Sequence, residues 1–68
     1  MTITFSRIYK FETHDEEHIV TFKKRGDGAW DMRSIEHGAI VSSGLTLKKT
    51  ARRMMNDLHR RGYIMTKS

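Results

Sequence analysis

Cysteine and proline are both absent from the sequence, and so is any long run of apolar residues. Without cysteine the chain forms no disulfide bond and no Cys-based metal site. A helix that spans a membrane needs about 20 apolar residues, and a secretory leader needs a continuous apolar block. The sequence contains neither pattern. We therefore expect a soluble, cytoplasmic protein with no membrane partner.

The chain also lacks the residue sets that catalysis and metal binding require. It has no recognisable set of nucleophile, base and orienting residue, and no glycine-rich phosphate loop. His14 and His18 are four residues apart with carboxylates between them, but the zinc-binding helix motif has glutamate directly after its first histidine. We interpret residues 12–17 as an acidic, solvated connection. We expect no metal, no cofactor and no enzymatic activity.

With 68 residues, the chain has the size of one small domain. A domain this short buries only about 60% of its unfolded surface, so its stability is marginal. We expect a single domain over residues 1–68, with a frayed tail over residues 65–68. Pairing with a second copy as a homodimer would enlarge so small a core.

Three segments are predicted to form β-strands because apolar residues recur at every second position. These segments are residues 3–11, 18–25 and 29–36, and a short fourth strand is expected over residues 39–43. Gly26-Asp27-Gly28 predicts a hairpin turn, and His37-Gly38 predicts a second turn. Arg7 interrupts the apolar face of the first strand. The positions expected to face the core are Ile3, Phe5, Tyr9, Phe11, Val20, Phe22, Trp30 and Met32.

The C-terminal segment has the pattern of an amphipathic helix. Thr46 is a suitable N-cap, and Gly62 is a suitable left-handed residue after the last turn, with Tyr63 packing back on the helix. The apolar stripe consists of Leu47, Ala51, Met54, Met55 and Leu58. The expected fold is therefore α+β (β-β-β-α): an antiparallel sheet of three or four strands packed on one C-terminal helix.

Acidic residues are nearly absent from this helical segment. Residues 46–62 contain six basic residues and a single acid, Asp57, so they carry the whole formal net charge of +5. Lys48 and Lys49 stand in the first turn, where the helix dipole disfavours cations by roughly 0.3–1 kcal/mol. A bound phosphate would make this placement of the two lysines favourable, because free backbone N–H groups and lysines together form a phosphate site. A localised basic stripe of this kind is typical of a polyanion-binding protein.

The string Lys48-Lys49-Thr50-Ala51-Arg52 resembles the KKxAK signature that opens the last helix of double-stranded RNA-binding domains. The resemblance covers about residues 18–61 and implies that Lys48, Lys49 and Arg52 grip phosphates across a major groove. The first helix of that family, which touches the minor groove, has no counterpart, because a strand is expected in its place.

A second resemblance fits the order of elements better. Residues 23–51, with a tryptophan after a glycine turn and Gly44-Leu45-Thr46 before the helix, are similar to the AP2-like arm-binding domains of phage integrases. That family inserts the exposed face of its sheet into the major groove of DNA. The resemblance implies the following readers: Thr21, Lys23, Arg25, Asp31 and Arg33.

We therefore predict a small nucleic-acid-binding protein that prefers duplex DNA to duplex RNA and contacts the phosphate backbone. The alternative is a small phage- or plasmid-type regulator or inhibitor, similar to anti-CRISPR proteins, whose basic helix docks on an acidic surface of a host protein. The predicted binding residues are Lys48, Lys49, Arg52, Arg53 and Arg60 on the helix and Lys23, Arg25 and Arg33 on the sheet.

Overall fold

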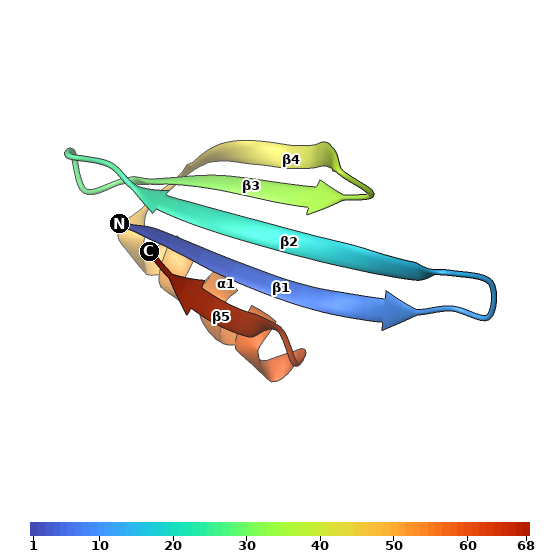
Figure 1. Ribbon diagram of the computed structural model, residues 1–68. Helices are drawn as coiled ribbons and strands as arrows, with labels where there is room; N and C mark the ends of the chain where they lie inside the picture. The colour runs from blue at the N-terminus through green and yellow to red at the C-terminus, as the bar shows by residue number, and fades with distance from the viewer.

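The computed structural model describes all residues, 1–68, and consists of one five-stranded antiparallel sheet and one helix (Figure 1). The order across the sheet is β4-β3-β2-β1-β5, so the chain builds the sheet from β1 outward to β4 and then returns to the opposite edge. The expected α+β fold is confirmed. The elements are β1 (Thr2–Lys10), β2 (Asp15–Lys24), β3 (Trp30–Glu36), β4 (Ala39–Thr46), α1 (Lys48–Arg60) and β5 (Ile64–Lys67).

Both predicted turns connect neighbouring strands. Gly26-Asp27-Gly28 joins β2 to β3, with Gly28 at a φ of 86° and the Ala29 N–H donating to Asp27 Oδ1 at 3.1 Å. His37 and Gly38 join β3 to β4, and both have positive φ, 54° and 75°. Positive φ at both central residues is the geometry of a type I′ turn, whose twist matches that of the flanking strands.

The core lies between α1 and one face of the sheet. It contains Ile3 and Phe5 from β1, Val20 and Phe22 from β2, and Trp30 from β3. Ala51 and Leu58 of the helix and Tyr63 after it complete the core, and Met54 and Met55 pack against it. The predicted alternation is therefore confirmed at these positions. Two expected core residues are exposed instead: Phe11, which lies beyond the end of β1, and Leu47.

The helix ends as the sequence predicts, but it begins differently. The Gly62 N–H donates to His59 O and the Tyr63 N–H to Leu58 O, each at 3.1 Å, which is the Schellman arrangement. The N-cap residue is Leu47 rather than Thr46. Thr46 is the last residue of β4, and its hydroxyl donates to Trp30 O at 3.4 Å, so it is directed to the sheet. This pairing of Thr46 with Trp30 moves the start of the helix by one residue.

Residues 65–68 are not a frayed tail, and this expectation is corrected. They continue β5, which pairs antiparallel with β1 from Ser6↔Ile64 to Ile3↔Lys67. Thr2 and Ser68 exchange two backbone hydrogen bonds of 3.0 and 2.9 Å, so the two ends of the chain lie side by side (Figure 1). The physical reason is the free edge of β1, whose N–H and C=O groups need partners.

The expected acidic connection over residues 12–17 is also corrected. Asp15, Glu16 and Glu17 belong to β2, and β4 likewise extends past the expected residue 43 to Thr46. The long β1–β2 hairpin projects beyond the end of the helix (Figure 1), giving extents of 43 × 23 × 20 Å. The single helix is too short and too polar to cross a membrane.

Candidate nucleic-acid interface

The outer face of α1 is the most uniformly basic surface of the protein. Its five predicted binding residues are all exposed, and none of them forms an ion pair: Lys48, Lys49, Arg52, Arg53 and Arg60. The one acid of the helix, Asp57, is paired with Arg61 at 2.8 Å. We call these five residues the basic helix face. Their charges are therefore not neutralised within the protein.

The first turn of α1 leaves backbone donors free. The first intrahelical hydrogen bond runs from the Ala51 N–H to Leu47 O at 2.9 Å, so the N–H groups of residues 48–50 have no partner in the helix. Leu47 has the extended backbone of an N-cap, with φ −71° and ψ 152°, but no side chain caps the helix. The first turn also contains no acid. Lys48 and Lys49 thus flank an uncapped, electropositive helix end.

One side of the helix borders β5 across a shallow groove of about 300 Å³. Arg52 and His59 of α1 and Lys67 of β5 line this groove, together with apolar residues of the core edge. Lys67 was missing from the predicted site because the tail was expected to fray. The pairing of β5 with β1 is what brings this additional cation beside the helix.

The predicted sheet residues lie on the opposite face. Thr21, Lys23 and Arg33 alternate with the core residues of their strands and line one shallow hollow together with Thr2 and Asp31. The helix covers only the other face of the sheet (Figure 1). The structure therefore separates the eight predicted binding residues into two surfaces and does not bring them into one site.

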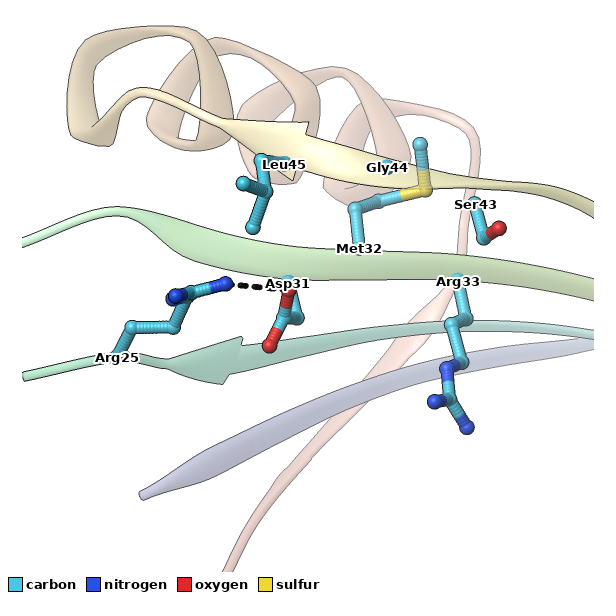
Figure 2. Close-up of a pocket in the computed structure, with 7 residues that line it drawn as sticks. All are labelled: Arg25, Asp31, Met32, Arg33, Ser43, Gly44 and Leu45. Carbon is cyan, nitrogen blue, oxygen red and sulfur yellow. Dashed lines mark ion pairs between the residues drawn. The ribbon is translucent and has the colours of Figure 1, made fainter.

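Acids partly neutralise the cations of the sheet face. Arg25 lies 3.5 Å from Asp27 and 3.7 Å from Asp31. Figure 2 shows the second of these ion pairs, with Arg33 farther along β3, in the lining of a hollow of about 280 Å³. Lys23 is directly opposite Asp31 in the register of β2 and β3. These neighbours make the sheet face a weaker phosphate surface than the basic helix face.

A cluster of histidines surrounds Glu16 at the end of the sheet that projects beyond α1. The Glu16 carboxylate lies 3.2 Å from His14 Nε2, 3.2 Å from His18 Nε2 and 2.5 Å from His37 Nε2. The hydrogen bond from His18 is the main reason that the pKa of Glu16 falls to about 2, with His14 and then His37 adding to it. No three His, Asp or Glu side chains are arranged to hold a metal ion.

Arg7, the residue that breaks the apolar alternation of β1, has a structural partner. Its guanidinium donates to Arg61 O at the C-terminal end of α1 and lies 4.5 Å from the centre of the Tyr9 ring. A cation is favourable at this end of the helix dipole. The hydroxyl oxygens of Tyr9 and Tyr63 lie 3.2 Å apart. Burial and this contact with Tyr9 raise the pKa of Tyr63 to about 12.

Comparison with protein-family models, with curated proteins and with solved structures found no match. The function of the protein is therefore inferred from the chemistry of its two charged surfaces.

Proposed function

We propose that the protein binds duplex nucleic acid by gripping its phosphate backbone with the basic helix face. The observation that carries this proposal is the set of five exposed cations that have no acidic partner, on a helix whose first turn is uncapped. Lysine and arginine side chains beside free N–H groups are suited to phosphate oxygens. In the absence of a polyanion, these like charges and the helix dipole repel one another at a small cost in stability.

The helix rather than the sheet is proposed as the phosphate-binding surface for two reasons. The cations of the sheet face have acids beside them, whereas those of the basic helix face have none. The sheet face also carries exposed isoleucines, which phosphates do not favour. Duplex DNA is proposed over duplex RNA because the only helix of the chain is the C-terminal one. The RNA-binding family that the helix resembles has an additional helix for the minor groove.

Phosphate contacts predict a strong dependence on salt. If all five cations contact phosphates, log K should fall with log salt with a slope of about −4.5, because each contact releases counterions. Fluorescence anisotropy with labelled duplex DNA, duplex RNA and single strands, measured over a salt series, tests this. We expect the tightest binding to duplex DNA.

Two charge-matched triple variants distinguish the two surfaces. Lys48→Glu/Lys49→Glu/Arg52→Glu reverses the helix cations, and Lys23→Glu/Arg25→Glu/Arg33→Glu reverses the same number on the sheet. We expect the helix variant to lose binding and the sheet variant to keep most of it. The opposite result would move the interface to the sheet. An absence of binding by the wild-type protein at low salt would refute the proposal and favour an acidic protein partner.

A further inference from the structure

A row of isoleucines crosses the face of the sheet that α1 leaves open. The register places Ile64, Ser6, Ile19, Ile35 and Ile40 side by side across all five strands. Ile8, on the same face of β1, is the next outward-facing residue along the strand. Ile8, Ile40 and Ile64 are 58%, 57% and 72% exposed. We call Ile8, Ile19, Ile35, Ile40 and Ile64 the isoleucine row.

Opposite charges lie on the two sides of this row. Along β2, Thr21 and Lys23 follow Ile19 on the open face, and Glu17 and Asp15 precede it at the same spacings. Arg33 is directly opposite Thr21 on β3. The open face thus has cations in excess on one side of the isoleucine row, where Asp31 lies opposite Lys23, and acids in excess on the other side, where Lys10 lies opposite Asp15.

We propose that this face binds a second copy of the chain, sheet against sheet. The two-fold axis crosses the strands at the isoleucine row, so that the two β2 strands run antiparallel and the two rows pack together. Lys23 of one protomer then lies over Asp15 of its partner, and Arg33 lies beside Glu17 of its partner. An axis parallel to the strands would instead place Lys23 on Lys23. The charges therefore select the first arrangement.

The exposed area agrees with a missing partner. The chain exposes 5144 Å². A monomer of 8.0 kDa is expected to expose about 4,450 Å², so the excess is roughly 700 Å². A stable interface buries about 800 Å² of each partner, and the elongated shape of the molecule also contributes to this excess. A nucleic acid fits the face less well, because Asp15 and Glu17 would repel phosphates.

This dimer leaves the basic helix face on the outside, so the inference is independent of the proposed function. Sedimentation equilibrium of the full chain over a wide range of protein concentration tests it. We expect a monomer–dimer equilibrium for the wild type. We expect only monomer for Ile19→Lys, whose new charge lies at the centre of the interface. Circular dichroism checks that this variant folds; should it not fold, Ile64→Lys at the exposed end of the row replaces it.

Charge reversal tests the direction of the two-fold axis. Glu17→Lys and Arg33→Glu should each weaken dimerisation by about tenfold or more, because like charges then oppose each other across the interface. The double variant should recover the wild-type constant, since it restores opposite charges. Misfolding gives no such recovery. A wild type that is monomeric at all concentrations, an Ile19→Lys variant that dimerises normally, or a double variant without recovery would each overturn the proposal.

Discussion

At the scale of one residue, Leu47 explains why the start of α1 lacks the usual capping hydrogen bond. It has the backbone of an N-cap, the residue is 74% exposed, and its side chain has no atom that can accept a hydrogen bond. Serine or aspartate at this position usually satisfies one of the free N–H groups. The protein instead leaves them open beside Lys48 and Lys49, which is consistent with a phosphate partner.

Leu47→Ser should therefore stabilise the protein and weaken its binding. Its hydroxyl can accept a hydrogen bond from the first turn, so we expect the free energy of unfolding to rise by about 1 kcal/mol. The same hydrogen bond occupies a donor that the phosphate would use, so the affinity for duplex DNA should fall. Urea unfolding and anisotropy measure the two effects, and Leu47→Ala, which adds no acceptor, is the control. A stabilised variant with undiminished affinity would show that these donors do not contact phosphate.

Glu16 makes the stability of the protein dependent on pH, through its contacts at the end of the sheet that projects beyond α1. Its pKa is lowered from an ordinary value of 4.5 to about 2, first by His18 and then by His14 and His37. A carboxyl whose pKa is lowered by folding contributes stability above its unfolded pKa. This contribution is complete above pH 4.5 and is lost as the pH falls through about 2.

Glu16→Gln should remove this contribution. We expect the variant to melt at a lower temperature than the wild type at neutral pH, and the two melting temperatures to converge as the pH falls from 4.5 toward 2. Thermal melts at a series of pH values measure this difference. Glu12→Gln, at an exposed carboxylate that forms no ion pair, is the control and should follow the wild type. Parallel curves for the wild type and Glu16→Gln below pH 4.5 would contradict the assignment.

At the scale of elements, β5 depends on the end of the helix. Gly62 at a φ of 86° reverses the chain, Tyr63 is buried in the core, and Ile64–Lys67 then run back along β1. β5 is the outer strand on that side of the sheet and protects β1 from water. β5 thus completes the sheet, although all four of its residues are exposed.

Deletion of Met65–Ser68 should destabilise the whole domain. It removes most of the β1–β5 ladder and the two hydrogen bonds between Thr2 and Ser68. With about 1 kcal/mol for each lost hydrogen bond, we expect a loss of about 3 kcal/mol or more in the free energy of unfolding. Urea unfolding measures it, and Thr66→Ala, which keeps the backbone of β5, is the control. A truncated chain as stable as the wild type would mean that β5 does not hold the edge.

At the scale of the whole molecule, the two surfaces point in opposite directions. The basic helix face lies on one side of the sheet and the isoleucine row on the other. A dimer formed through the isoleucine row therefore has the layers helix, sheet, sheet and helix, with a basic helix face on each outer side. Sheets pack about 10 Å apart, so a duplex bound to one helix does not reach the other.

The dimer should consequently bridge two duplexes. An immobilised duplex saturated with protein is expected to capture a second, labelled duplex at low salt. Ile19→Lys should bind the immobilised duplex with the wild-type intrinsic affinity but capture no second one. Capture by a variant shown to be monomeric would place two binding surfaces on a single protomer and would contradict this arrangement.

The sequence by itself determined the α+β fold, most of the core, and the turns that follow β2 and β3. Alternation identified Ile3, Phe5, Val20, Phe22 and Trp30 because each strand buries one face, which is a local pattern. Gly28 and Gly62 were predictable because a positive φ favours glycine wherever the chain turns sharply. The concentration of positive charge on the helix is likewise a property of composition. The exposure of this charged face was also predictable, because the apolar stripe of the helix lies on its opposite side.

Only the tertiary structure decided the features that depend on distant partners. β5 forms because β1 has a free edge, and Arg7 contacts the end of α1 because the helix ends beside it. Glu16 contacts His37 because the turn between β3 and β4 lies beside the start of β2. Leu47 rather than Thr46 is the N-cap because the pairing of β4 with β3 continues to Thr46 and Trp30. The position of Lys67 beside the basic helix face has the same origin. Only the pairing of β5 with β1 brings the C-terminal strand next to α1, and no local pattern in the chain encodes that pairing.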